Sequence, residues 1–301
     1  MAISSIKNSM TSRFKVGHLV EADYSQLEIR VLAIATRDPV LIDDLNAGID
    51  PHKMFAAQIY GIPQDQVTPD QRKLAKGFSF QLQYGASAGG ISKHWNVPKK
   101  LVQTFIDAYY TRYPLVKHWQ DQNIAFTKDH AVNKGIRVKS KDDPTTDIPV
   151  LSSTLPGIWY GSAAPYIGGF FMNQVQSNYG EPDFAPTQIK NYPIQGGAAD
   201  IILLVLGALH SNWRTIFKQY EHIHMVNTVH DSFLLDLDTI VLKDIRGEIE
   251  SFKEALERLP AMLMRDMFGL DSPVAFPVDI SIGRNWGDMK SIIIWNEDYM
   301  E

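Results

Sequence analysis

The feature that most constrains the fold of this chain is the stretch VNTVHDSFLLDL, residues 226–237. The residues on both sides of its centre are mostly β-branched, aromatic or otherwise good strand formers. His230, Asp231 and Ser232 lie between the two runs, where a tight turn would project their side chains outward. The stretch therefore predicts a β-hairpin that carries an imidazole and a carboxylate side by side at its tip.

Two interpretations of Asp231 are open. Asp and Ser favour bends because their side chains hydrogen-bond to nearby backbone, so the residue could simply help to make the turn. Alternatively, Asp231 binds a metal ion, which requires a second carboxylate elsewhere in the chain. The sequence offers one such carboxylate at the junction of another strand and a helix.

This second carboxylate is Asp23, in the stretch VEADYSQLEIR, residues 20–30. It falls where a short apolar strand meets a helix, so an ordinary helix N-cap is the competing interpretation. If the two strands pair in one sheet, Asp23 and Asp231 are expected to hold the same cations. Mg²⁺ suits such a site because it binds one or two carboxylates together with substrate phosphates and water.

A second pattern lies in RKLAKGFSFQLQYG, residues 72–85, where Arg72, Lys76, Phe80 and Tyr84 recur every four residues. Residues four apart share a face of a helix. Two cations followed by two aromatic rings would suit a triphosphate beside a base, because cations pair with phosphates and rings stack on bases. An amphipathic helix with buried rings and solvated cations explains the same pattern.

A third pattern is IKNYPIQGGAAD, residues 189–200. Asn191 and Gln195 carry amides of the kind that read base edges. The Gly-Gly pair would let backbone or nucleic acid approach closely. A loop followed by the start of a helix fits this stretch equally well.

The remaining patterns predict an α+β fold, a sheet domain with a helical insertion. Residues 140–187 are rich in Pro, Gly, Ser and Asn and are expected to be irregular. The other expected elements are a strand that turns helical after Tyr24, helices over 68–86, 98–125, 198–220 and 243–267, and a last strand over 274–283.

Composition narrows the class of protein. The chain has 301 residues, 45% of them hydrophobic, and no cysteine, which excludes disulfides and thiolate metal sites. The net charge of −5 argues against a strongly phosphate-binding protein, but cations gather at 72–76, 93–100 and 134–141. The longest apolar run, residues 201–209, is too short to span a bilayer. We expect a cytoplasmic protein with no membrane partner.

Taken together, five stretches resemble the motifs of DNA polymerase family A, the family of bacterial DNA polymerase I and its phage relatives. They occur in the order of that family: DYSQLEIR, RKLAKGFSFQLQYG, NYPIQGGAAD, VHDS and ISIGRNWGDMK. The resemblance implies a polymerase palm, an antiparallel sheet with flanking helices, and a mostly helical fingers insertion. It implies template-directed DNA synthesis from dNTPs on primer–template DNA, in the cytoplasm of a bacterial host if the chain is phage-encoded.

The resemblance also assigns the catalytic roles. Asp23 and Asp231 would bind two Mg²⁺ ions, which Mn²⁺ is expected to replace, and the backbone carbonyl of Tyr24 would lie near them. Lys76 would donate a proton to pyrophosphate.

Further residues would bind the incoming dNTP and the DNA. The residues implied for dNTP binding are Glu28, which would exclude a ribose 2′-hydroxyl, His52, Arg72, Lys76, Phe80 and Tyr84. The residues implied for primer–template binding are Tyr84, Asn191, Gln195 and His230.

Three departures from the family pattern stand out. Ser232 replaces the usual Glu of VHDE, which removes a negative charge, and Gln81 replaces the usual Gly. The region 140–187 replaces the part of the chain where the family often carries a basic hairpin.

The resemblance further implies a division into domains. Residues 1–60 would be the first part of the palm, 61–135 the fingers, 136–187 an irregular connection and 188–301 the second part of the palm. Thumb and exonuclease domains are expected to be absent, which favours a split enzyme whose second polypeptide carries a thumb. The alternatives are a non-catalytic DNA-binding subunit derived from a polymerase and a single-subunit RNA polymerase.

Overall fold

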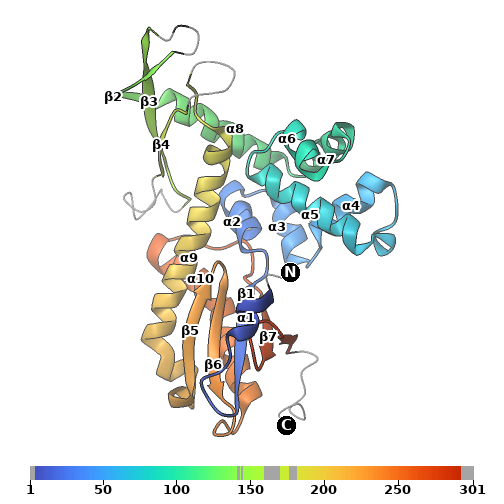
Figure 1. Ribbon diagram of the computed structural model, residues 1–301, viewed down its shortest axis with the longest axis vertical. Helices are drawn as coiled ribbons and strands as arrows, with labels where there is room; N and C mark the ends of the chain where they lie inside the picture. The colour runs from blue at the N-terminus through green and yellow to red at the C-terminus, as the bar shows by residue number, and fades with distance from the viewer. Residues whose placement is uncertain (1–3, 141–142, 144, 159–169, 176–181, 293–301) are drawn as a thin grey trace. The chain divides into compact units, whose positions relative to one another are not determined.

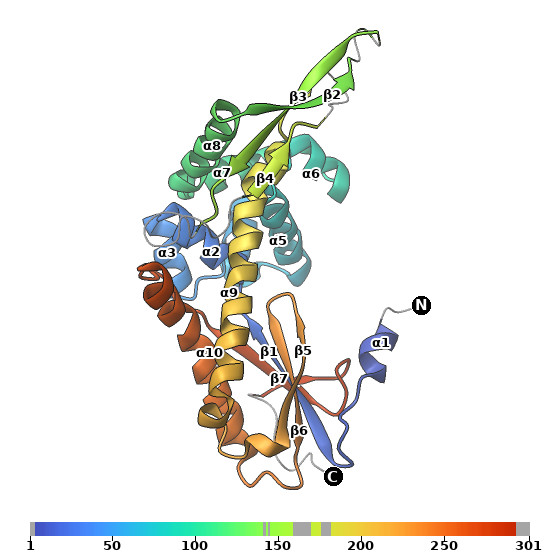
Figure 2. The ribbon, with the colours of Figure 1, turned by 90° about the vertical axis from the view of Figure 1, so that its left-hand side faces the viewer.

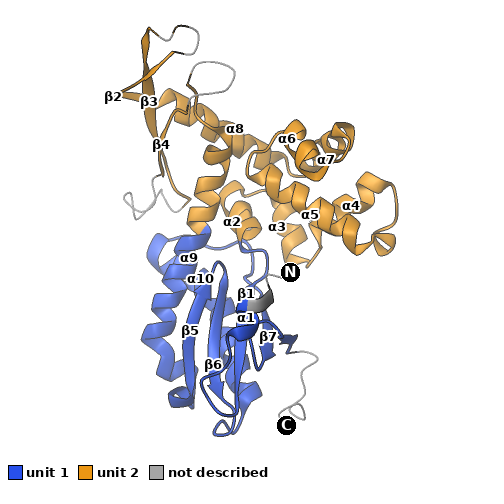
Figure 3. Cartoon of the chain, viewed as in Figure 1, with its two compact units in different colours: residues 1–27, 198–301 blue, residues 28–197 orange. Residues whose placement is uncertain are grey.

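The computed structural model of the protein describes residues 4–140, 143, 145–158, 170–175 and 182–292. The chain divides into two compact units (Figure 3). Unit 1 contains residues 1–27 and 198–301, and unit 2 contains residues 28–197. The units therefore differ in extent from the expected palm and fingers ranges, because residues 28–60 and 188–197 fall in unit 2. Their assignment to palm and fingers stays a prediction.

Within the described part of unit 1, five strands form an antiparallel sheet in the order β5-β6-β1-β7-β8 (Figure 1). The strands are β1 (Gly17–Tyr24), β5 (Ile223–Val229), β6 (Ser232–Asp238), β7 (Val278–Gly283) and β8 (Lys290–Ser291). The predicted hairpin is confirmed, since β5 and β6 pair through a turn at His230 and Asp231. His230 takes a φ of 55°, the left-handed region that such a two-residue turn uses.

One face of this sheet is covered by helices. Figure 2 shows α9 (Pro186–Ile216) and α10 (Ile245–Phe268) along it. The Tyr24 hydroxyl, on β1, donates a hydrogen bond of 2.6 Å to the Leu256 carbonyl of α10. Because side chains alternate along a strand, Ala22 and Tyr24 face the helices and Asp23 faces the opposite side.

The opposite face of the sheet is partly covered by the segment that begins with α1 (Ser4–Ser9). Ser12 Oγ donates to Asp236 at 2.5 Å, and the Arg13 backbone N–H and Nε both donate to the same carboxylate. Trp286 Nε1 donates to Glu21 at 2.8 Å. These contacts cover the part of the face around Asp236 and Glu21. At Asp23, the end of β1 instead contacts the turn between β5 and β6.

Unit 2 is mainly helical. Its helices are α2 (Leu27–Thr36), α3 (Pro39–Asn46), α4 (Pro51–Tyr60), η1 (Gln64–Gln66), α5 (Pro69–Gln83), α6 (Ala88–Trp95), α7 (Lys99–Arg112), α8 (Pro114–Asp129) and the first part of α9. The predicted start of α5 is confirmed, because the Thr68 side chain caps the helix and Gln71 returns a hydrogen bond to the Thr68 N–H. Gly85, with a φ of 77°, follows the end of this helix.

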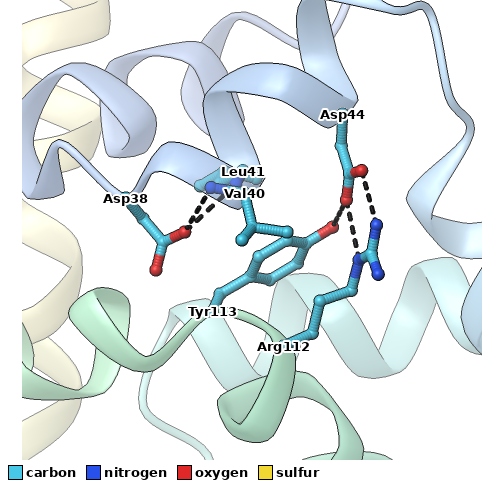
Figure 4. Close-up of polar contacts among 6 residues, drawn as sticks. All are labelled: Asp38, Val40, Leu41, Asp44, Arg112 and Tyr113. Carbon is cyan, nitrogen blue, oxygen red and sulfur yellow. Dashed lines mark hydrogen bonds and ion pairs between the residues drawn. The ribbon is translucent and has the colours of Figure 1, made fainter.

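Two buried carboxylates, one at the N-cap of α3 and one within it, connect α3 to the helices α7 and α8 of unit 2 (Figure 4). Asp38 caps α3, since its Oδ1 accepts from the N–H groups of Val40 and Leu41 at 3.1 Å. Its Oδ2 accepts from the Leu115 N–H at 3.0 Å. One carboxylate therefore begins α3 and also holds the first turn of α8.

Asp44, near the end of α3, holds the junction between α7 and α8 (Figure 4). It accepts two hydrogen bonds from Arg112, at 2.8 and 2.6 Å, and one from the Tyr113 hydroxyl at 2.6 Å. Asp44 is 3% exposed and Tyr113 fully buried, so water cannot replace these partners.

A small sheet follows α8. Among the described residues it has three antiparallel strands, β2 (Val132–Lys139), β3 (Asp147–Leu155) and β4 (Phe170–Asn173). The expectation of an irregular region over 140–187 is thus wrong for β3 and β4. The sequence did not reveal the strands of this small sheet because turn-forming residues interrupt them. In addition, β2 is exposed along almost its whole length, so its sequence shows no alternation of apolar and polar residues.

Two predicted helices also differ from the structure. The helix expected over 98–125 is two helices, because Pro114 begins a new helix directly after Tyr113. The helix expected from residue 198 begins at Pro186 and continues through Pro193. Among the described residues, α9 is long and apolar enough by length and composition to cross a membrane, a criterion that core helices of globular units also meet.

We predict that Asp44→Ala lowers the free energy of unfolding by about 3 kcal/mol, because it leaves Arg112 and Tyr113 without their shared acceptor. Urea denaturation monitored by circular dichroism measures the change. The matched control is Asp43→Ala, on the same helix but exposed, with an expected loss within about 0.5 kcal/mol. Equal losses in the two variants would contradict a structural role for Asp44.

Candidate functional site

The pairing of β1 with β6 brings Asp23 and Asp231 together, as the sequence predicted. In the register of unit 1, Asp23 lies opposite Ser232 on β6 and opposite Asp279 on β7. The Tyr24 N–H donates to the Asp231 carbonyl at 3.1 Å, which ties the hairpin turn to the end of β1. Asp231 precedes β6 directly, so its carboxylate reaches that of Asp23. We call these two residues the carboxylate pair.

Electrostatics at the carboxylate pair disfavour two negative charges. Burial and the neighbouring charges of Asp231 and Glu21 raise the pKa of Asp23 to about 6, and a hydrogen bond with the Asp231 side chain acts in the same direction. Asp279 adds a smaller repulsion. Like charges in a shared site behave in this way, and a bound cation relieves the repulsion.

The carboxylate pair fits a hard divalent cation that is completed by other ligands. Within the described part of the chain, no group of three or more His, Asp or Glu side chains is arranged to hold one ion. Mg²⁺ needs only one or two protein carboxylates when substrate phosphates and water supply the rest. Any cation held by the carboxylate pair would therefore need further ligands from outside the protein.

The predicted stripe of Arg72, Lys76, Phe80 and Tyr84 lies along α5 of unit 2. We call these four residues the α5 stripe. Arg72 Nε donates to Asp50 at 2.5 Å, and the Lys76 ammonium lies 5.5 Å from the centroid of the Phe80 ring. The rings of Phe80 and Tyr84 are 6.3 Å apart. The cations and rings thus form one continuous row of side chains.

His52, which the resemblance assigned to the phosphates, is buried behind the α5 stripe. Its side chain is 1% exposed, its Nδ1 lies 3.2 Å from Ser79 Oγ, and its ring lies 6.0 Å from that of Phe80. Burial lowers its pKa to about 4, against the opposing effect of Asp50. In the structure His52 is a neutral support for the α5 stripe, and its contact with phosphates stays a prediction.

Glu28 and Tyr84 are joined by a hydrogen bond. The Tyr84 hydroxyl donates to Glu28 Oε2 at 2.8 Å, so two residues that the resemblance assigned to dNTP binding are in contact. This bond fixes the position of the Glu28 carboxylate relative to the end of α5.

The residues predicted to contact primer and template lie on two elements. Asn191 and Gln195 are four apart in α9 and therefore share a face, although a loop was considered equally consistent with this stretch. Among the described residues, the buried side-chain oxygen of Asn191 has no hydrogen-bond partner. His230 is exposed at the hairpin turn of unit 1.

The glycines near these residues have packing roles rather than ligand roles in the structure. A Cβ at Gly77 would collide with the ring of Trp95, and one at Gly196 would collide with the ring of Phe170. The sequence predicted that the Gly196-Gly197 pair lets backbone or nucleic acid approach closely. In the structure Gly196 makes room for the ring of Phe170 on β4, and Gly77 makes room for Trp95 on α6.

Two acidic residues that contact these sites were not identified from the sequence. Asp50 pairs with Arg72, and Asp279 lies opposite Asp23. Asp50 directly precedes a proline and caps α4, so its sequence signal is that of a helix start. Asp279 interrupts an apolar strand, which is the signal that could have revealed it.

We predict that acid destabilises unit 2 through His52. The pKa of His52 is lowered on folding, so the unfolded chain binds more protons and stability falls as the pH drops from its ordinary value of 6.5 toward 4. Between pH 7.5 and pH 5 the loss attributable to His52 is about 2 kcal/mol. Urea denaturation at both pH values, in the wild type and in His52→Gln, measures it.

The control for this experiment is His118→Gln, which removes an exposed histidine of the same unit. We expect His118→Gln to keep the acid loss of the wild type and His52→Gln to reduce it. An identical acid loss in all three proteins would contradict the prediction.

Comparison with known proteins shows the family to which the chain belongs. The sequence profile of DNA polymerase family A matches residues 2–288. DNA polymerase I of Pseudomonas aeruginosa is 29% identical over 271 residues, which is 90% of this chain and 25% of that protein. DNA polymerase I of Caldicellulosiruptor bescii is 27% identical over 275 residues, 91% of this chain and 27% of that protein. The chain thus spans about a quarter of the length of these relatives.

The fold also matches a solved structure. The POL domain of Pol1 from M. smegmatis, in complex with DNA primer-template and dNTP, superimposes with a TM-score of 0.63. The match covers 94% of this chain and 42% of that one at 20% sequence identity. At this identity the similarity establishes the fold.

Proposed function

This chain belongs to DNA polymerase family A, and from that premise we propose that it catalyses template-directed DNA synthesis. In the proposed reaction the primer 3′-hydroxyl oxygen attacks the α-phosphorus of a dNTP. A new phosphodiester bond forms, the bond between the α- and β-phosphates breaks, and pyrophosphate leaves. The strand grows in the 5′ to 3′ direction.

The observation that carries this proposal is the carboxylate pair. Two strands far apart in the sequence bring Asp23 and Asp231 together on a rigid sheet, in a chain that matches the family over residues 2–288. Phosphoryl transfer depends mainly on positioning and on stabilising charge. A fixed pair of carboxylates is the part of such a site that a fold must supply.

We propose that Asp23 and Asp231, with the Tyr24 backbone carbonyl nearby, hold two Mg²⁺ ions. Bound Mg²⁺ would activate the 3′-hydroxyl and neutralise charge on the triphosphate and on pyrophosphate. The raised pKa of Asp23 supports this role, because two crowded carboxylates favour a cation. Ser232, directly opposite Asp23, donates its hydroxyl to the Val229 carbonyl within the hairpin at 3.0 Å.

The α5 stripe is proposed to bind the incoming dNTP. Arg72 and Lys76 would contact the triphosphate, and Lys76 would donate a proton to the departing pyrophosphate. Phe80 would pack on the base, and Tyr84 would lie against the templating pair. The Asp50 carboxylate beside Arg72 orients its guanidinium before the nucleotide arrives.

Asn191, Gln195 and His230 are proposed to contact primer and template, since amides and imidazole donate to base edges and phosphates. Firm grip on the duplex is proposed to come from thumb-bearing polypeptide outside these 301 residues, in a second chain. The relatives are about four times as long as the matched region, so they carry further sequence outside it. We place the reaction in a bacterial cytoplasm, with no membrane partner.

We predict that the purified chain extends a labelled primer with Mg²⁺ and dNTPs, and that Asp231→Ala reduces extension at least a thousandfold. The reason is that the variant removes one of the two carboxylates proposed to position both cations for phosphoryl transfer. A gel-based primer-extension assay measures the rate. The matched control is Asp238→Ala, at the other end of β6, which should retain most of the activity.

Two results would separate the alternatives. Extension that survives in Asp231→Ala would contradict the proposed mechanism. Absence of extension by the wild type, with and without a thumb-bearing polypeptide from the native source, would instead favour a non-catalytic binding subunit.

We predict that Glu28→Ala weakens selection against ribonucleotides. Loss of a side chain beneath the sugar would raise the incorporation of rNTPs relative to dNTPs by roughly tenfold or more. The ratio of kcat/KM for dATP and ATP measures the selection. Tyr84→Phe keeps the ring but removes the 2.8 Å hydrogen bond to Glu28, so a smaller change in the same direction is expected. An unchanged ratio in Glu28→Ala would contradict the assignment.

A further inference from the structure

A cleft of about 230 Å³ lies in unit 2, away from the residues discussed above. It is formed where the end of α8 meets the small sheet of β2, β3 and β4, and its walls include Phe126, His130, Lys134, Ser153 and Phe171. Its volume is below the roughly 300–1,000 Å³ of sites for drug-sized ligands. The cleft therefore suits a single ring system.

The floor of the cleft contains an unsatisfied polar group. Ser153 is 2% exposed, and among the described residues its hydroxyl has no hydrogen-bond partner. The neighbouring Ser152 hydroxyl, by contrast, donates to Asn173 at 2.6 Å. Buried hydroxyls are nearly always paired, so the Ser153 hydroxyl, which has no partner among the described residues, could pair with a ligand or a water in the cleft.

Aromatic rings line the same cleft. Phe171, on β4, is 51% exposed, so part of its ring is accessible to a ligand. The His130 ring stacks on Phe126 with a centroid distance of 3.9 Å and an interplanar angle of 16°. The cleft thus offers flat surfaces on which another planar ring can stack.

The cleft is also lined by a cation, Lys134. The Lys134 ammonium lies 4.4 Å from the centroid of the Phe171 ring. On the same strand, Arg137 donates to the Asp147 carbonyl and Lys139 forms an ion pair with the Asp147 carboxylate at 3.0 Å. Lys134 is thus the cation of β2 that lies at the cleft, where it can reach a phosphate next to a bound ring.

We propose that this cleft binds one unstacked base of a single-stranded nucleic acid, with Lys134 on the adjacent phosphate. Stacking on aromatic rings and pairing of cations with the backbone are the two elements of single-strand binding. The Ser153 hydroxyl would pair with a ring nitrogen or carbonyl of the base. This inference rests on the proposed function, in which the single strand is uncopied template, but its test requires no catalysis.

The test compares two fluorescent oligomers of equal length and charge, oligothymidine and its fully abasic counterpart, by anisotropy without Mg²⁺ or dNTPs. We expect the wild type to bind oligothymidine about tenfold more tightly. Phe171→Ala should remove most of this preference and leave the affinity for the abasic oligomer unchanged. Ser153→Ala should reduce the preference by a smaller factor.

Electrostatic contacts are tested separately. Lys134→Met should weaken both oligomers and lower the slope of log affinity against log salt by about 0.7, the value for one single-strand phosphate. The matched control is Ile136→Ala, an exposed residue of β2 outside the cleft, which should change neither affinity. Because the assay contains neither Mg²⁺ nor dNTPs, a failure of polymerase chemistry cannot be mistaken for a failure of this site.

Equal wild-type affinity for the two oligomers would overturn the proposal. The same conclusion would follow if Phe171→Ala behaved like Ile136→Ala, or if it weakened both oligomers equally.

Discussion

The central position of β1 is the constraint on which the rest of unit 1 depends. This strand pairs on one side with β6 and on the other with β7, so its register fixes which residues of three strands share a face. A slip of one residue would turn Asp23 toward α10 and Tyr24 away from it. The apolar side of β1 therefore determines, through packing, where the carboxylate is placed.

The proposed site residues of the two units carry opposite charges. In unit 1 several carboxylates lie close together at the end of β1, and their repulsion, together with burial, raises the pKa of Asp23. In unit 2 the cations of the α5 stripe are held by Asp50 and by the ring of Phe80. Each arrangement has a charge balance that a ligand of opposite charge would improve: a cation at the carboxylate pair and an anion at the α5 stripe.

The sequence revealed the elements in which local preference and tertiary packing agree. The hairpin of β5 and β6, the strand β1 and the helix α10 have clear periodicity and turn residues, and the carboxylate pair followed from the hairpin. The start of α9 was missed because Pro193, Gly196 and Gly197 look like a break. In the structure Gly196 makes room for Phe170, a tertiary contact that no local pattern encodes. The contacts of Asp44 and the unpaired Ser153 hydroxyl are equally invisible to periodicity, because they depend on which helices and strands meet.

The discontinuity of unit 1 has a consequence for synthesis on the ribosome. Unit 2 is one contiguous segment, residues 28–197, whereas β1 pairs with strands from the last third of the chain. At roughly 5–20 residues per second, β1 emerges on the order of ten seconds or more before β6 and β7 are made. During that interval an apolar strand lies without its neighbours, exposed to chaperones and to misassembly, beside a unit that can already be folded. A nascent chain thus contains α5 well before it contains β6, the strand that completes the carboxylate pair.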